Sequence, residues 1–193
     1  SHNTGLLELN CSSDSIRSLD VTKNTSLILL DCYFNRLTSL DVTKNTELAK
    51  LFCSSNKLST LDVTKNTKLT KLRCFLANLN TLDVTKNTQL VELNCHSNHF
   101  TSLDVTKNTL LKELICRDNQ LTSLDISRNI QLEKLHCYGN AFTTASLDTI
   151  YCSLPDRLPA DMAKSATRKS MTASAGGAVS RYLIDTKKSF PKI

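Results

Sequence analysis

The feature that most limits the fold of this chain is a seven-residue motif, Leu-Asp-Val-Thr-Lys-Asn-Thr, that recurs at a fixed interval. It occupies residues 19–25, 40–46, 61–67, 82–88 and 103–109, and a variant, Leu-Asp-Ile-Ser-Arg-Asn-Ile, occupies 124–130. A second motif, Leu-x-x-Leu-x-Cys, precedes every copy, and its cysteines are Cys11, Cys32, Cys53, Cys74, Cys95, Cys116 and Cys137. Both motifs repeat every 21 residues without an insertion. A strict period of this size predicts a solenoid, in which one structural unit stacks on copies of itself.

The repeat can be divided into inward and outward positions. Near each cysteine the apolar residues alternate with polar ones, which predicts a short strand with Leu72 and Cys74 inward and Lys71, Arg73 and Phe75 outward. We expect seven such strands in one parallel sheet. Further along the coil, a second apolar column consists of Ile16, Leu37, Leu58, Leu79, Phe100, Leu121 and Phe142. Between the two lies a column of turn residues, namely Asp14, Asn35, Asn56, Ala77, Asn98, Asn119 and Asn140. An asparagine there can bond to the backbone of the turn, and Ala77 breaks this ladder in the fourth coil.

The other half of the coil is too short and too β-branched for a helix. We predict that Leu-Asp-Val forms a second short strand and that Thr-Lys-Asn-Thr forms a turn. The aspartates of this half form a column of like charges, from Asp20 to Asp125. We expect the basic residue three positions later in each coil to compensate for that charge.

The seven repeated cysteines, which we call the cysteine ladder, are predicted to be free and buried. Their Cβ vectors run parallel, which does not give the torsion that a disulfide requires. A free buried cysteine behaves as a small apolar residue. The chain contains no Cys-x-x-Cys or Cys–His spacing suited to zinc, so we expect no metal site and no cofactor.

The pattern L-x-x-L-x-C-x-x-N-x-L resembles the leucine-rich repeat, and in particular its 21-residue Cys-bearing bacterial class, the internalin J-like surface proteins. The resemblance covers residues 6 to about 152. It implies a right-handed solenoid of the α/β repeat type, mostly strand and coil, with the sheet on its concave face. It also implies an extracellular or cell-surface location and a non-catalytic role in adhesion, by binding a protein of the host or of another cell.

The domain boundaries follow from where the repeat holds. We expect residues 1–5 to be the tail of a preceding coil, 6–144 to be the array, and 145–193 to be a degenerate last coil with a C-terminal cap. Residues 146–154 predict a short amphipathic helix, and residues 179–190 contain enough apolar side chains to cover the open end of the last coil. The N-terminal coil has no such cover, so end-to-end self-association through it is a further expectation.

The net charge is +6, and residues 155–193 hold eight basic residues against three acidic ones. These basic residues are spread singly without interleaved aromatic residues, so we interpret the tail as a solvated cap and not as a nucleic-acid surface. No apolar run is long enough to span a bilayer.

Catalysis is not predicted, because no constellation of reactive residues occurs. His96 follows Cys95 and His136 precedes Cys137, but alternation places each pair on opposite faces of the sheet. We therefore expect these histidines to be exposed.

The outward positions around each cysteine vary while the rest of the coil is constant. Large apolar side chains gather in coils two to four and form a predicted apolar strip on the concave face, which consists of Tyr33, Phe34, Phe52, Phe75 and Leu76. Its predicted basic rim consists of Lys50, Lys71 and Arg73, which suits a partly acidic partner. Coils five to seven carry Glu92, His96, Glu113 and Arg117 instead, a polar face expected to steer a partner more than to anchor it.

Two functions remain open at this point. The strip favours an interaction module that binds a protein ligand, although the chemistry of the ligand (protein, glycan or another polymer) does not follow from the sequence. The alternative is a structural spacer within a longer surface protein, which would need no ligand of its own.

Overall fold

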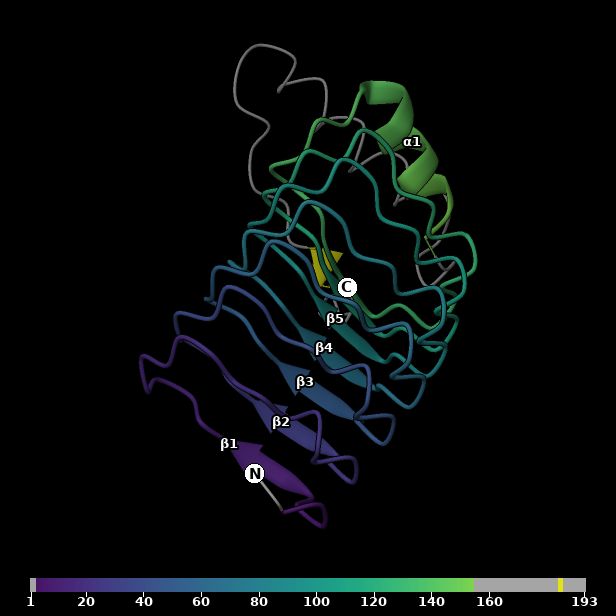
Figure 1. Cartoon of the computed structure of the whole chain (residues 1–193). Coiled ribbons are helices and arrows are strands. Elements are labelled where there is room, and N and C mark those ends of the chain that lie inside the picture. Colours follow the sequence, from purple (N-terminus) through teal and green to yellow (C-terminus); the bar gives the residue numbers. More distant parts are fainter. Residues whose placement is uncertain (1–2, 155–183, 186–193) are drawn as a thin grey trace, which may run out of the picture.

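The computed structural model describes residues 3–154 and 184–185. Figure 1 shows a stack of similar coils with one strand in each and a single helix beside the last of them. The seven strands of the array have the same three positions in each coil: β1 (Glu8–Asn10), β2 (Leu29–Asp31), β3 (Lys50–Phe52), β4 (Lys71–Arg73), β5 (Glu92–Asn94), β6 (Glu113–Ile115) and β7 (Lys134–His136). The helix α1 (Thr144–Cys152) and a two-residue strand, β8 (Ile184–Asp185), complete the described elements.

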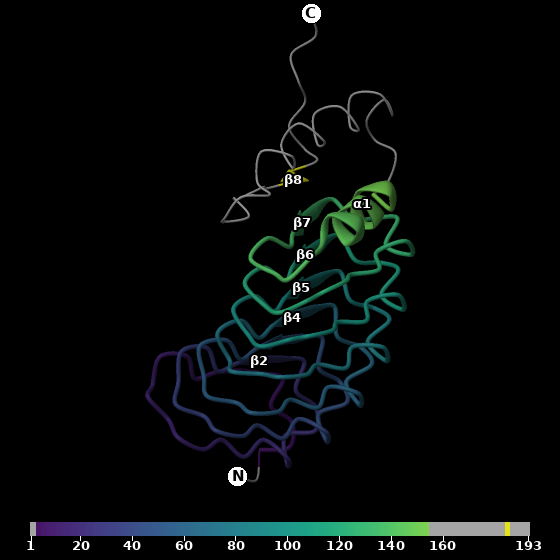
Figure 2. The same ribbon diagram turned by 90° about the horizontal axis from the view of Figure 1, so that it is seen from above.

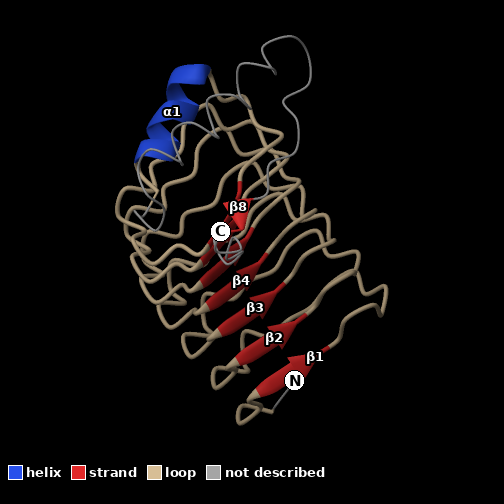
Figure 3. Cartoon of the chain, turned by 180° about the vertical axis from the view of Figure 1, so that it is seen from behind, coloured by secondary structure: helices blue, strands red, loops and turns tan. Residues whose placement is uncertain are grey.

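The strands pair in chain order from β1 to β8, and β1 to β7 are all parallel. The register never slips, so Leu51 pairs with Leu72 and Leu72 pairs with Leu93, each one repeat away. Figures 2 and 3 show the result, a sheet on one side of the stack and turns on the other. The predicted solenoid of seven parallel strands is confirmed. β8 adds an antiparallel strand to the outer edge of β7.

The core consists of the predicted columns. Leu51, Cys53 and Leu58 have no exposed surface, and Phe100 is buried in the same column as Leu58. The first and last members of the columns, including Cys11, Cys137 and Phe142, are only half-buried, because a coil covers them on one side alone. The inward positions assigned from alternation are therefore confirmed, whereas three residues assigned to outward positions, Ser54, Glu92 and Ile115, are also buried.

The predicted second strand at Leu-Asp-Val is wrong, since the described coils contain no strand there. The carbonyl of Val21 is already used twice: it accepts from the backbone N–H of Asn24 at 2.9 Å and from Nδ2 of Asn45, in the next coil, at 2.9 Å. Nδ2 of Asn45 also donates to the carbonyl of Asn24 at 2.8 Å. The same two bonds recur in the four following coils, through Asn66, Asn87, Asn108 and Asn129. Side-chain amides, not a backbone ladder, join the coils on this side.

The charge of the aspartate column is also balanced differently from the prediction. Oδ1 of Asp62 accepts from the hydroxyl of Thr64 at 2.7 Å and from its backbone N–H at 2.9 Å. These two bonds are the main reason that the pKa of Asp62 lies below its usual value, and the charge of Lys65 contributes less. No ion pair joins the aspartate column to the lysine column within residues 3–154.

On the sheet side, the predicted asparagine ladder is confirmed. Nδ2 of Asn56 donates to the carbonyls of Cys32 at 3.0 Å and Cys53 at 3.1 Å, while its Oδ1 accepts from the N–H of Leu37 at 3.0 Å. Ala77 interrupts the ladder in the fourth coil, so no such bond reaches the N–H of Leu58. The turn changes with it.

The changed turn is visible at Asn78, which has a left-handed φ of 67°. In the neighbouring coils the equivalent residues, Lys57 and His99, donate their N–H to the coil before at 2.9 Å, and no such bond is made by Asn78. The first coil, with Asp14 in the ladder position, has the same left-handed turn at Ser15. The asparagine side chain therefore decides which turn the backbone adopts.

The predicted helix exists, but it begins and ends two residues earlier than the predicted 146–154. Thr143 caps it: the hydroxyl of Thr143 accepts from the N–H of Ser146, and the hydroxyl of Ser146 accepts from the N–H of Thr143. Ile150 is buried against the last coil. The predicted cover by residues 179–190 lies outside the described residues, apart from the pairing of β8 with β7.

The cysteine ladder can be tested by substitution. Burial raises the pKa of the Cys74 thiol well above its usual value, so the thiol stays protonated and unreactive. Cys74→Ser should lower the free energy of unfolding by about 1–3 kcal/mol, because it buries a hydroxyl that has no hydrogen-bond partner provided for it. Chemical denaturation measures the change. Cys152→Ser is the matched control, since this cysteine is exposed and should be replaceable without loss. A Cys74→Ser chain as stable as the wild type would contradict the packing role.

The gap in the asparagine ladder can be filled. Ala77→Asn should raise the free energy of unfolding by about 1–2 kcal/mol, because the new amide can donate to the carbonyls of Cys53 and Cys74 and accept from the N–H of Leu58. Asn56→Ala should lower it by a similar amount as the reverse control. If Ala77→Asn is destabilising, the left-handed turn at Asn78 is required by the fourth coil for another reason.

Candidate interaction surface

The second residue after each ladder cysteine adopts a left-handed backbone in all seven coils. The members of this left-handed column are Ser13, Phe34, Ser55, Leu76, Ser97, Asp118 and Gly139, with φ between 52° and 66°. An L-residue in this region costs roughly 1–2 kcal/mol, and large side chains are uncommon there. Phe34 and Leu76 are nevertheless 61% and 52% exposed, so packing inside the array does not explain them. These two residues are strained and exposed at once.

The aromatic residues one position earlier make contact across a coil. Tyr33 and Phe75 lie in the second and fourth coils, yet their ring centroids are 6.1 Å apart. They approach each other over Ser54, which is only 1% exposed and whose Oγ accepts from the N–H of Phe75 at 3.1 Å. Phe34 contacts Tyr33 with a centroid distance of 5.9 Å. Three members of the predicted apolar strip thus form one cluster.

Phe52 and the predicted basic rim form a second group. The guanidinium of Arg73 lies 5.1 Å from the centroid of the Phe52 ring. Arg73 also pairs with Oε1 of Glu92 at 2.6 Å, and Lys71 pairs with Oε2 of Glu92 at 3.1 Å. Lys50 pairs in register with Lys71, is exposed, and has no ion-pair partner among the described residues.

Glu92 therefore belongs to the rim, although the sequence placed it on the polar face of coils five to seven. Its side chain is only 11% exposed. Burial alone would raise the pKa of Glu92, but hydrogen bonds and charge from Arg73 and Lys71 outweigh burial and lower it. The rim thus holds three cations around one ionised carboxylate and keeps an excess of positive charge.

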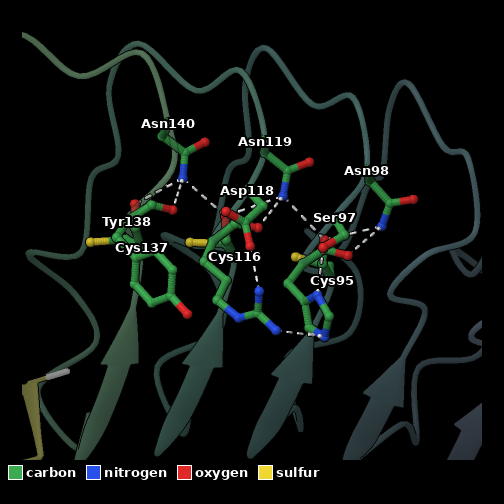
Figure 4. A network of polar contacts seen from close by, with 11 residues as sticks. Cys95, Ser97, Asn98, Cys116, Asp118, Asn119, Cys137, Tyr138 and Asn140 are labelled. Carbon is green, nitrogen blue, oxygen red and sulfur yellow. Dashed lines mark hydrogen bonds and ion pairs between the residues drawn. The ribbon is translucent and has the colours of Figure 1, made fainter. Parts of the chain in front are cut away.

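The polar half of the face is continuous with the apolar strip. The imidazole of His96 stacks on Phe75 with a centroid distance of 4.5 Å and an interplanar angle of 8°. Nη2 of Arg117 lies 3.4 Å from Nε2 of His96, and its guanidinium lies 5.6 Å from the centroid of the Tyr138 ring. Arg117 also pairs with Asp118. Figure 4 shows Ser97, Asp118 and Tyr138 on three successive coils, with Asn98, Asn119 and Asn140 of the ladder above them in this view.

We call this row the stacked column; it consists of Tyr33, Phe75, His96, Arg117 and Tyr138. The expectation that His96 and His136 are exposed is wrong, because both are half-buried, and His96 lies between Phe75 and Arg117. The sequence placed His96 and Arg117 on a polar face that steers a partner, not in contact with the strip, and it left Tyr138 out of the site. A signal was present, since they share the repeat position of Tyr33 and Phe75.

The described residues show no other centre of chemistry. No group of three or more potential metal ligands gathers within them. None of their helices has the length and the apolar composition that crossing a bilayer needs.

Comparison with solved structures places the fold among bacterial proteins. The functional domain of internalin J from Listeria monocytogenes, which includes a cysteine ladder, is 36% identical with a TM-score of 0.63, over 79% of this chain and 38% of that one. Internalin F of the same species is 23% identical with a TM-score of 0.70, over 81% and 49%. A Leptospira interrogans leucine-rich-repeat protein is 24% identical with a TM-score of 0.54, over 78% and 36%. The chain thus spans less than half the length of these relatives. No protein-family model matches the sequence, and no curated protein matches it.

The stacked column has a testable effect on the titration of His96. Burial, followed by the charge of Arg117, lowers the pKa of His96 to about 4, and the charge of Asp118 opposes this only in part. The unfolded value is about 6.5, so the stability that the neutral imidazole contributes is fully present above that pH and is lost as the pH falls toward 4. NMR titration of the imidazole should find the low midpoint.

Two variants serve as controls for this titration. Arg117→Gln should raise the midpoint of His96, because it removes a neighbouring positive charge while Asp118 remains. His96→Gln should remove this part of the pH dependence of unfolding. A midpoint near 6.5 in the wild type would mean that the imidazole does not stack as described.

Proposed function

Because the chain is a bacterial leucine-rich-repeat protein of the internalin J type, we propose that it is a non-catalytic module that binds a protein ligand through the concave face of its sheet. The proposed anchor is the apolar strip, which consists of Tyr33, Phe34, Phe52, Phe75 and Leu76. The proposed rim consists of Lys50, Lys71 and Arg73. The ligand that we favour is a protein of a host or of another cell.

The observation that carries this proposal is the strain at Phe34 and Leu76. Serine, aspartate and glycine fill the same left-handed position in the other coils, so the fold does not require a large side chain there. Each of the two large residues gives up backbone stability and exposes apolar surface to water. A strained residue that the fold does not need points to a role in binding.

The charges around the strip suit an acidic partner. Lys50, Lys71 and Arg73 outnumber the two nearby carboxylates, Glu92 between Lys71 and Arg73 and Asp31 beside Phe52. Arg73 lies over Phe52 and is held by Glu92, so it is preorganised and loses little freedom on binding. An acidic protein segment would meet both apolar anchors and fixed cations.

We place the module outside the bacterial cell, either secreted or at the cell surface, in line with the resemblance to internalin J. The five inner thiols of the ladder, from Cys32 to Cys116, are compatible with an oxidising surrounding, because they are buried and burial raises their pKa. End-to-end self-association through the N-terminal coil stays a prediction.

The proposal is tested by two substitutions that should separate stability from binding. Phe34→Asn and Leu76→Asn should leave the free energy of unfolding unchanged or raise it by up to about 1 kcal/mol, since asparagine tolerates the left-handed region better. The same substitutions should weaken binding of the labelled chain to intact host cells at least tenfold. Denaturation and flow cytometry measure the two effects.

Ile130→Thr is the matched control for this experiment. Ile130 is 70% exposed, lies outside the concave face, and occupies a position where threonine stands in the other copies of the motif. The control should bind as the wild type does. Saturable binding that the strip variants do not weaken would refute the strip as the site. No saturable binding by the wild type would favour the alternative, a structural spacer without a ligand.

A further inference from the structure

The two strained apolar residues flank a serine in the coil between them. Backbone bonds fix this order: the N–H of Phe34 donates to the carbonyl of Ser54 at 3.0 Å, and the N–H of Ser55 donates to the carbonyl of Phe75 at 2.9 Å. Phe34, Ser55 and Leu76 are therefore successive members of the left-handed column. Strand spacing places Phe34 and Leu76 about 10 Å apart, with Ser55 midway, about 5 Å from each.

The distance of about 5 Å is one at which rings stack in this protein. In the adjacent column, Phe75 and His96 belong to successive coils and their centroids are 4.5 Å apart. A flat or branched apolar group above Ser55 would contact Phe34 on one side and Leu76 on the other at a similar distance. The serine side chain is too short to supply such a group itself.

The surroundings of this position are fixed. Tyr33 and Phe75 close over Ser54 and form an aromatic wall beside it. The hydroxyl of Ser54 is already engaged by the N–H of Phe75, whereas Ser55 is half-buried and its hydroxyl has no hydrogen-bond partner among the described residues. The large exposed fractions of Phe34 and Leu76 show that these two side chains do not close over Ser55. The position is bordered by apolar surface on three sides.

We propose that the position above Ser55, between Phe34 and Leu76, is the seat for one large apolar side chain of an acidic polypeptide segment. This rests on the proposed function and deepens it, because it names the contact that anchors the partner. The carboxylates of the segment are attracted by the excess positive charge of Lys50, Lys71 and Arg73. Leucine or an aromatic residue between acidic residues is the chemistry that fits.

The probe is a synthetic pentapeptide with a blocked N-terminus and C-terminus, of sequence Glu-Asp-Trp-Asp-Glu. Its binding to the whole chain is followed by NMR titration, against peptides with alanine at the centre or with lysines as flanks. The tryptophan peptide should bind at least tenfold more tightly than either. Equal binding of the alanine peptide would overturn the seat, and equal binding of the lysine peptide would overturn the acidic partner.

Ser55→Leu places a large side chain in the seat and should weaken binding of the tryptophan peptide at least tenfold. Leucine is compatible with this backbone, because Leu76 already occupies the equivalent position in the next coil. Ser13→Leu is the matched control, since it makes the same change in the same column but on the other side of Phe34, outside the space between Phe34 and Leu76. The control should bind the peptide as the wild type does.

A second variant keeps the test decisive if Ser55→Leu does not fold. In Ser55→Asn, the asparagine tolerates the left-handed backbone and its side chain extends into the seat. This variant should therefore also weaken binding of the peptide. Wild-type affinity in a folded Ser55→Leu or Ser55→Asn chain would overturn the seat. If cell binding still depends on Phe34 and Leu76 in that case, the proposed function stands and only the seat fails. If cell binding does not depend on them, the proposed function fails first.

Discussion

The array depends on hydrogen bonds that asparagine side chains make between successive coils. Each strand of the parallel sheet is only three residues long, so the sheet provides hydrogen bonds for few backbone groups. The buried carbonyls in the rest of each coil need other hydrogen-bond partners. On the sheet side the amide of Asn56 both donates and accepts hydrogen bonds, and the other asparagines of that ladder do the same. On the other side Asn45 uses its two donors, while its Oδ1 is buried without a hydrogen-bond partner. The asparagine column that includes Asn45 therefore contributes less stability per residue, because an unpartnered buried oxygen carries a desolvation cost.

Much of the fold could be predicted because each position of the repeat has the same structural environment in all seven coils. Period and alternation were enough to place the cysteines, the leucine columns and the sheet-side asparagine ladder. They were not enough for the Leu-Asp-Val segment, where β propensity favours a strand but the carbonyl of Val21 is taken by Asn24 and Asn45. Propensity describes a backbone in isolation, whereas the outcome here is decided by a side chain 24 residues away.

The site could be predicted less well than the fold, for a related reason. The predicted strip is a set of residues with outward positions, and alternation supplies those positions. Contacts between long side chains depend on reach and rotamer, which alternation does not supply. Glu92 extends to Lys71 and Arg73 of the coil before, and Tyr33 reaches over Ser54 to Phe75. The contact of Glu92 crosses from one predicted group of coils to the other, and the contact of Tyr33 passes over the coil between.

In a chain of near-identical coils, departures from the repeat are informative about function. The fourth coil departs at the ladder position, where Ala77 stands in place of asparagine, and the turn changes with it at Asn78. Natural proteins break local rules most often at functional sites. The loss of the ladder asparagine at Ala77 lies directly beside the strained Leu76, so the same coil gives up stability twice.

The stacked column explains how such a coil can still present a fixed surface. The backbone of each coil in a solenoid pairs only with the adjacent coils, so a binding face that spans several coils needs side chains that hold those coils in register. Phe75 is held by Tyr33 on one side and by His96 on the other, and His96 is held in turn by Arg117. The fourth coil is thus supported through its outward aromatic ring where its inward asparagine is missing. A residue that we first assigned to partner binding is for that reason also part of what keeps its own coil in place, and strip substitutions that spare Phe75 measure binding most cleanly.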